Sequence, residues 1–154
     1  SNMLSRVRTI ADLQFGRGIG SQVFPDTCRF ITSRRGGVRQ VLLDGKRLAT
    51  LRAHDGRLTL GLAGGKRLYS ALPGPSGRVV LRDDVTSFIA AGKNLFSRHV
   101  VQADLDIHAG DEVMVVDGEG RFIAIGEAML SGDEMLAFDT GMAVSVRHGI
   151  QKEE

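Results

Sequence analysis

A short basic segment, residues 92–99, carries the side chains best suited to chemistry in this sequence. It reads Gly-Lys-Asn-Leu-Phe-Ser-Arg-His and supplies two of the five Lys and Arg side chains that follow residue 82. Lysine, arginine, asparagine and histidine side chains donate hydrogen bonds to phosphate and sugar oxygens. The segment therefore predicts contact with a nucleic acid through Lys93, Asn94, Arg98 and His99.

A purely structural role for the same segment stays open. Phe96 and Val100 are apolar enough to belong to a core, and Lys93 follows a predicted helix, where a cation interacts favourably with the carboxyl-terminal end of the helix dipole. Surface cations also commonly do no more than solvate the protein.

Two glycine-containing runs in the first 40 residues are weaker candidates. Residues 16–20 (Gly-Arg-Gly-Ile-Gly) match neither the dinucleotide-binding pattern nor a phosphate-binding loop that ends in Gly-Lys-Ser/Thr, so we expect a turn after a first helix. Residues 34–37 (Arg-Arg-Gly-Gly) favour a hairpin turn, because arginine-glycine segments that bind nucleic acid normally repeat this motif. Arg34 and Arg35 remain candidates for phosphate contact.

The sequence offers no constellation for catalysis or metal binding. The four histidines have no paired spacing, and the single cysteine, Cys28, cannot complete a thiolate site. No carboxylate pair stands in an apolar setting, and no serine has a nucleophile-elbow context. We therefore expect no metal, no cofactor and no enzymatic activity in this chain.

Charge divides the sequence into two halves. Residues 29–82 contain twelve Lys and Arg against Asp44 and Asp55, a net charge of +10, whereas residues 83–154 contain five against fourteen acidic residues, a net charge of −9. A polyanion should be attracted first to the amino-terminal half, because phosphate attraction is long-ranged and needs clustered positive charge. Alternatively, the two halves neutralise each other across an interface.

The amino-terminal half predicts a helix followed by an antiparallel meander. Apolar residues recur at helical spacing over residues 4–14, and Leu58, Leu60 and Leu62 alternate as in a sheet with one buried face. The solvent face should then collect arginines, and Arg39 joins Arg34 and Arg35 as an RNA-binding candidate. We expect strands at 27–33, 38–44, 46–53 and 57–63, joined by Gly-Gly and Asp-Gly turns, then a helix at 66–72 and a Pro/Gly-rich linker at 73–77.

The carboxyl-terminal half predicts a small sheet with two short helices. Asp83 and Asp84 are suited to cap a helix that ends at Gly92 and has Phe88 in its apolar face. Ser131 with Glu134 forms a capping-box pattern before a second helix. Between them, residues 111–117 and 121–130 predict paired strands around a glycine-containing turn. Residues 143–146 predict a closing strand, with Arg147 and His148 at its end.

Five stretches resemble known families. The runs GKNLFSRHVV, AGDEVMVVD, FIAIGEAMLS and GMAVSVRHGI resemble the PUA domain, a compact RNA-binding pseudobarrel. The upstream run ADLQFGRGIGSQVF resembles the DYQFG segment that opens the domain before PUA in archaeosine tRNA-guanine transglycosylases, with Leu13 in place of the usual Tyr. The resemblance implies an α+β chain, with an amino-terminal antiparallel sheet and helices at 3–77 and a PUA-type β pseudobarrel at 78–150.

The resemblance also implies a function. In PUA domains the helix-to-strand edge and the closing strand form the RNA surface, which would place Arg147 beside the 92–99 segment. In the transglycosylases catalysis resides in a large barrel with aspartates and a zinc site, and this sequence contains no counterpart. We therefore expect a cytoplasmic, non-catalytic RNA-binding protein that binds tRNA or another structured RNA and assists a separate archaeosine-type modification enzyme.

The mechanism expected from this reading combines both halves. Phosphates would dock on the arginine-rich sheet face, the PUA edge would position a helical end or loop, and the two would form one continuous surface. The alternative is a ribosome- or translation-associated protein-interaction adaptor, in which the divided charge serves contacts between proteins.

Overall fold

The computed structural model describes residues 2–32 and 38–152, which form two compact units. The chain divides after Leu72, so that the amino-terminal unit comprises the described residues up to 72 and the carboxyl-terminal unit those from 73 onward. No helix among the described residues combines the length and the apolar character needed to cross a bilayer.

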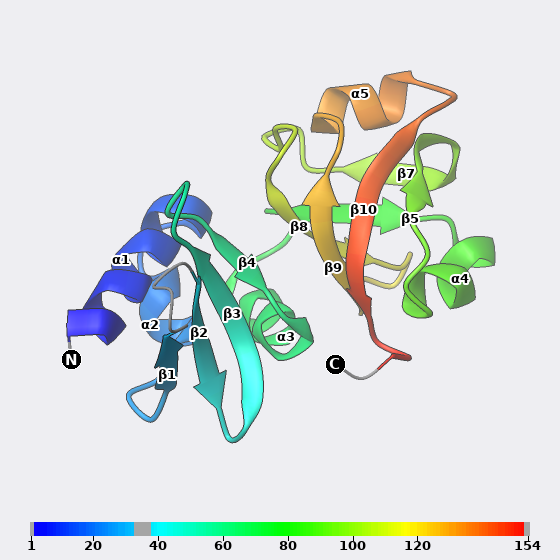
Figure 1. The fold of residues 1–154 in the computed structure, drawn as a ribbon. Coiled ribbons are helices and arrows are strands. Elements are labelled where there is room, and N and C mark those ends of the chain that lie inside the picture. Colours follow the sequence, from blue (N-terminus) through cyan, green and yellow to red (C-terminus); the bar gives the residue numbers. More distant parts are fainter. Residues whose placement is uncertain (1, 33–37, 153–154) are drawn as a thin grey trace. The chain divides into compact units, whose positions relative to one another are not determined.

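The amino-terminal unit contains a four-stranded antiparallel sheet with strands in sequence order, which confirms the predicted meander (Figure 1). The helix predicted over residues 4–14 is also confirmed, as part of a slightly longer element. The elements are α1 (Asn2–Phe15), α2 (Ile19–Val23), β1 (Arg29–Thr32), β2 (Val38–Leu43), β3 (Lys46–Arg52), β4 (Leu58–Leu60) and α3 (Leu62–Ala71).

The register gives this sheet two chemically different faces. One row crosses all four strands through Phe30, Val41, Ala49 and Leu60, and three of these four residues are buried. The neighbouring row runs through Ile31, Gln40, Thr50 and Thr59 and points to the other face, because successive side chains of a strand alternate. We call this second face the open face. The apolar row supplies the burial that holds the sheet to its helices, at about 25 cal/mol per Å² of apolar surface.

Helix α3 begins four residues earlier than the sequence predicts. The alternation of leucines suggested a strand to residue 63, but β4 ends at Leu60 and the helix starts at Leu62. The physical reason is a close approach between α3 and β3: a Cβ at Gly64 would lie 1.8 Å from the Leu48 carbonyl oxygen. Glycine at this position lets the helix backbone contact the strand directly.

The carboxyl-terminal unit is a nearly closed barrel built on a mixed six-stranded sheet in the order β6-β10-β9-β8-β5-β7, in which β5 and β8 are parallel. Figure 1 shows α5 and α4 near opposite ends of β10. The elements are β5 (Arg78–Leu81), η1 (Asp83–Val85), α4 (Thr86–Ala90), β6 (Leu95–Phe96), η2 (Ser97–His99), β7 (Val100–Ala103), β8 (Glu112–Val116), β9 (Phe122–Ala128), α5 (Gly132–Ala137) and β10 (Met142–Gly149).

The predictions for this unit that depend on residues close together in sequence, a hairpin turn and a capping box, are confirmed. Strands β8 and β9 pair around a turn in which Gly120 has a φ of 81°, and Ser131 with Glu134 forms the predicted capping box. The fold class predicted from the sequence, an antiparallel sheet with helices followed by a PUA-type pseudobarrel, is confirmed.

Three details of the carboxyl-terminal unit differ from the sequence prediction. Asp83 and Asp84 do not cap a helix: Asp83 accepts a hydrogen bond from the Gly118 amide, and Asp84 forms an ion pair with Arg82 at 2.7 Å. Phe88, expected in the apolar face of that helix, is 59% exposed. The closing strand extends to residue 149, so Arg147 lies inside β10 rather than after it.

Candidate functional site

The basic segment begins where helix α4 ends. Gly92 has a φ of 100°, and its amide donates to the Ile89 carbonyl, while the Lys93 amide donates to the Phe88 carbonyl. This left-handed turn directs the chain away from the helix and leaves the Lys93 side chain exposed. Within residues 2–32 and 38–152, the Lys93 ammonium group has no hydrogen bond or ion pair.

Asn94 has a structural role. Its Oδ1 atom accepts a hydrogen bond from the Val146 amide at 3.0 Å, at the point where the register between β10 and β9 shifts. The bond joins the residue directly before the edge strand β6 to the irregular part of β10 and gives the Val146 amide a hydrogen-bond acceptor. The side-chain NH₂ group takes no part in this bond.

Phe96 and Arg98 form an exposed stacked pair. The Arg98 Cζ atom lies 5.5 Å from the centroid of the Phe96 ring, and Phe96 is 38% exposed. This geometry is a cation–π contact, which orients the guanidinium group without neutralising it. Nucleobases stack on both aromatic rings and guanidinium planes. Phe96 is thus available to a ligand, contrary to the alternative that it belongs to the core.

His99 lies at the end of η2 and is half-buried. Its carbonyl accepts a hydrogen bond from the Arg82 amide at 2.8 Å, which ties the basic segment to the end of β5. Nearby, a hydrogen bond from the Arg82 side chain lowers the pKa of Asp84, and His99 contributes a weaker electrostatic effect. The local surface beside His99 therefore carries both signs of charge.

Arg147 pairs with a buried carboxylate. Its Nη1 atom donates to Glu112 Oε2 at 2.9 Å, and its Nη2 atom donates to Oε1, so the pair is bidentate. The Glu112 side chain is 4% exposed and that of Arg147 is 24% exposed. Arg147 was predicted to contact RNA, but its guanidinium is already used in neutralising Glu112.

The arginines predicted in the amino-terminal unit fall into two groups. Arg34 and Arg35 lie outside the described residues. Arg39 lies in β2 opposite Thr32 and Leu51, and this row shares the helix-covered side with the apolar core row. Arg39 therefore does not belong to the open face of the sheet.

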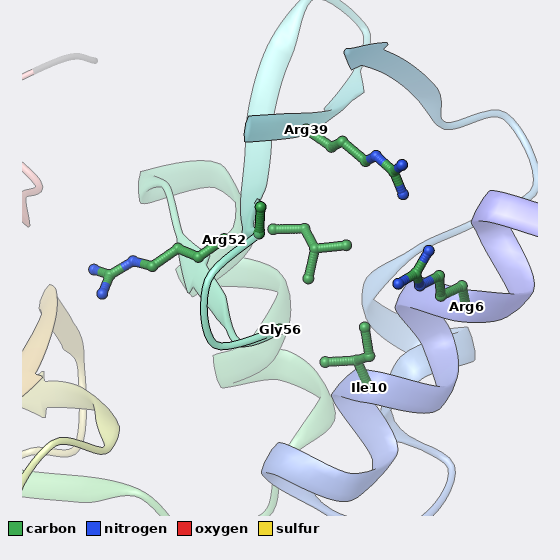
Figure 2. Close-up of a pocket in the computed structure, with 7 residues that line it drawn as sticks. Arg6, Ile10, Arg39, Arg52 and Gly56 are labelled. Atoms are coloured by element: carbon green, nitrogen blue, oxygen red, sulfur yellow. The ribbon is translucent and has the colours of Figure 1, made fainter. Parts of the chain in front are cut away.

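The open face carries other arginines. Arg47 donates to the Thr50 hydroxyl at 2.8 Å, which places both side chains on this face, and Arg52 lies two residues beyond Thr50 in the same strand. In Figure 2 the Arg52 side chain points to the opposite side from that of Arg39. The expectation that arginines gather on the solvent face is met by these residues. Arg52 also lies 4.0 Å from the Asp55 carboxylate.

Sequence reasoning did not single out Arg6. Its side chain points toward Arg39 across a pocket of about 140 Å³ between α1 and the sheet (Figure 2). The amphipathic pattern of α1 placed Arg6 off the apolar face, and such cations ordinarily only solvate a helix. The only sequence feature that could have pointed to Arg6 is its spacing of four residues from Ile10, because residues at that spacing are neighbours on a helix and Ile10 lines the same pocket.

The described residues contain no group of three His, Cys, Asp or Glu side chains placed to hold a metal ion. Cys28 is half-buried, and burial raises the pKa of its thiol against the opposing effect of Arg67 and Arg8. The chemistry that this arrangement does offer is the binding of anions and aromatic bases by exposed cations and the Phe96 ring.

Comparison with known proteins identifies both units. Residues 5–75 match the patch-forming domain C2 of tRNA-guanine transglycosylase, and residues 77–150 match the PUA domain. The tRNA-guanine(15) transglycosylase of Thermococcus kodakarensis is 44% identical over 146 residues, which cover 95% of this chain and 25% of that protein. The chain thus spans about a quarter of the length of the curated relatives that it matches.

Solved structures resemble the chain in fold. A hypothetical protein of Pyrococcus horikoshii OT3 gives a TM-score of 0.76 at 22% identity, over 98% of this chain and 92% of that one. A chain of the archaeal box H/ACA sRNP Nop10-Cbf5 complex gives a TM-score of 0.50 at 26% identity, over 55% of this chain and 27% of that one. Together with the sequence matches, these findings show that the chain consists of a C2 domain of the tRNA-guanine transglycosylase type followed by a PUA domain, homologous to the carboxyl-terminal region of archaeal tRNA-guanine(15) transglycosylases.

Proposed function

We propose that this chain binds tRNA through its PUA domain and its basic amino-terminal unit, without catalysing a reaction itself. The observation that carries the proposal is the match to both domains, in the family's order, across 95% of the chain. The PUA domain is an RNA-binding fold, and the relatives' name specifies a tRNA.

The cations without carboxylate partners supply the affinity. Lys93 and Arg98 are exposed, and neither forms an ion pair within the described part of the chain. Exposed cations of this kind replace the counterions that surround RNA phosphates. The Phe96 ring offers a stacking surface for an unpaired base next to them. Recognition would thus combine phosphate contacts with the shape of a folded RNA.

We place the chain beside a separate tRNA-modification enzyme. The relatives that carry the transglycosylase name are about four times as long, and this chain aligns with their carboxyl-terminal region alone. In this role, the C2-type and PUA domains would hold the tRNA while a modification enzyme acts on it. Affinity capture from native lysate is expected to recover tRNA together with a modification enzyme, and recovery of neither would contradict this role.

The direct test is equilibrium binding of total tRNA, followed by fluorescence anisotropy. Lys93→Gln combined with Arg98→Gln should weaken binding by about tenfold or more at roughly 100 mM salt, because two phosphate contacts are lost. The matched control is Arg82→Gln combined with Lys152→Gln, which removes the same charge from the same unit outside the basic segment. Equal losses in the two variants would contradict the assignment.

The alternative, a protein-interaction adaptor, has one observation in its favour. Leu105, Leu136 and Phe138 of the carboxyl-terminal unit are 61%, 46% and 46% exposed. Such side chains suit a protein partner. Absence of tRNA binding at low salt, with protein partners still captured, would favour the adaptor.

A further inference from the structure

Two arginines that are distant in sequence line one pocket of the amino-terminal unit. Arg6 comes from α1 and Arg39 from β2, and Figure 2 shows both guanidinium groups over a floor that includes Ile10. Leu51 belongs to the same floor, and the pocket volume is about 140 Å³. The pocket thus combines two cationic side chains with two apolar ones, Ile10 and Leu51.

The fold, rather than chance rotamers, brings these groups together. Arg6 and Ile10 are four residues apart on α1, so they are neighbours at the edge of its buried face, which is formed by Val7 and Ala11. Arg39 pairs directly with Leu51 across β2 and β3, so both side chains point to the same side of the sheet. The third arginine at the pocket, Arg52, has its guanidinium directed away, toward Asp55.

None of the described acids of this unit lines the pocket. Asp12 accepts from the Gly20 amide at 2.7 Å, Asp26 pairs with Arg8 at 2.9 Å, and Asp55 accepts from the Arg57 amide at 3.0 Å. Asp44 occupies the turn between β2 and β3, with a φ of 52°. Counting the described residues, neither the Arg6 nor the Arg39 side chain has a hydrogen bond or an ion pair.

Two guanidinium groups directed at one space repel each other unless an anion lies between them. A phosphate group is the anion that best fits the arrangement, because guanidinium groups present forked donors that match phosphate oxygens. The pocket is smaller than the roughly 300–1,000 Å³ that encloses a small-molecule ligand. It therefore suits one group of a larger polymer rather than a whole nucleotide or cofactor.

We propose that the Arg6–Arg39 pocket binds a single backbone phosphate of the RNA, with the adjoining ribose against Ile10 and Leu51. This inference rests on the proposed function and deepens it, because it assigns a specific phosphate site to the C2-type domain in addition to the contacts of the PUA domain. Since phosphate contacts fix register without reading sequence, the site positions the RNA rather than selecting its bases.

The test is tRNA binding by the full chain, measured by fluorescence anisotropy at salt concentrations from about 50 to 300 mM. Arg6→Gln combined with Arg39→Gln should weaken binding by about tenfold at roughly 100 mM salt and reduce the magnitude of the log–log salt slope by about one, the value for one lost phosphate contact. The control pair, Arg17→Gln with Lys46→Gln, removes the same charge from the same unit outside the pocket. It should change affinity by less than about threefold.

Further variants keep the test decisive. Arg6→Lys combined with Arg39→Lys retains the charge but loses the paired N–H donors of the guanidinium groups, so we expect tRNA affinity to fall by about two- to fivefold. Should the double Gln variant fail to fold by circular dichroism, Arg6→Gln alone, on the exposed face of α1, is compared with Arg17→Gln and should still bind more weakly.

The outcomes separate this inference from the proposed function. If wild-type chain binds tRNA and the pocket variant loses no more affinity than its control, the phosphate site is wrong while RNA binding stands. If wild-type chain does not bind tRNA even at low salt, the proposed function fails and the phosphate site fails with it.

Discussion

The two units of this protein use their arginines differently. In the carboxyl-terminal unit, Arg82, Arg121 and Arg147 each pair with a carboxylate. In the amino-terminal unit, Arg6 and Arg39 share a pocket without a carboxylate partner among the described residues. Net charge indicates which half attracts a polyanion from a distance, but pairing decides which side chains are free to bind a phosphate.

The carboxyl-terminal unit nevertheless keeps unpaired cations in its basic segment, residues 92–99. Lys93 and Arg98 lie at the end of α4 and in η2, and within the described residues neither has an acidic partner. An acidic domain with two uncommitted cations on one edge can bind RNA at that edge and repel it elsewhere. The comparison therefore predicts that RNA contacts involve Lys93 and Arg98 in one unit and Arg6 and Arg39 in the other.

The largest expected effect on stability comes from breaking the ion pair between Arg147 and Glu112. Arg147→Met should lower the free energy of unfolding by about 3–5 kcal/mol, because it leaves the Glu112 carboxylate buried without a partner. Urea denaturation followed by circular dichroism measures the change. Glu112→Gln in the same background should recover part of the loss by removing the buried charge.

Arg147→Met also tests the comparison itself. If the variant were as stable as wild type yet lost most of its tRNA affinity, Arg147 would be an RNA contact, as the family resemblance first implied, and pairing would not decide which arginines bind.

A smaller effect on stability is expected at Asp117, whose side chain is 4% exposed. Burial opposes ionisation, but hydrogen bonds from the Arg121 amide, the Arg121 side chain and the Glu119 amide outweigh it, so the pKa of Asp117 lies below its ordinary value of 3.8. Asp117→Asn should cost about 1–3 kcal/mol near neutral pH.

The pH dependence of that effect has a defined sign. Because the folded-state pKa is lowered, the ionised Asp117 contributes stability that is full above 3.8 and is lost as the pH falls through the lower folded-state value. The melting temperature of wild type should therefore fall more steeply in acid than that of Asp117→Asn. If the melting temperatures of the two proteins fell in parallel with pH, the ionisation of Asp117 would not contribute to the pH dependence of stability.

The smallest expected effect separates stacking from charge. Phe96→Ala removes the ring under the Arg98 guanidinium and should weaken binding of a single-stranded RNA by roughly 1 kcal/mol, about fivefold, without altering the salt slope. Anisotropy titrations with single-stranded and duplex RNA measure this difference. A changed slope would mean that Phe96 acts by positioning the Arg98 charge instead of stacking on a base.

Sequence reasoning succeeded where the determinants are local. The capping box at Ser131 and Glu134 and the hairpin turn containing Gly120 depend on residues three or four positions apart, and both were predicted. The resemblance of longer runs to the PUA domain supplied the fold of the carboxyl-terminal unit.

The candidate site was harder to predict because its determinants are distant in sequence. Arg147 and Glu112 are 35 positions apart, and Asn94 and Val146 are 52 apart, so the sequence did not reveal that these side chains bond within the fold. The position of Arg39 on the helix-covered side depends on the register of β2 with its neighbours, and the sequence did not determine that register either.

The salt dependence of tRNA binding by the wild-type chain tests the central claim most directly. We predict a linear fall of log affinity with log salt concentration, with a slope of about −3, as expected when Lys93, Arg98 and the Arg6–Arg39 pocket each contact one phosphate. A slope near zero, or no binding at low salt, would contradict the claim that uncommitted cations of both units grip an RNA.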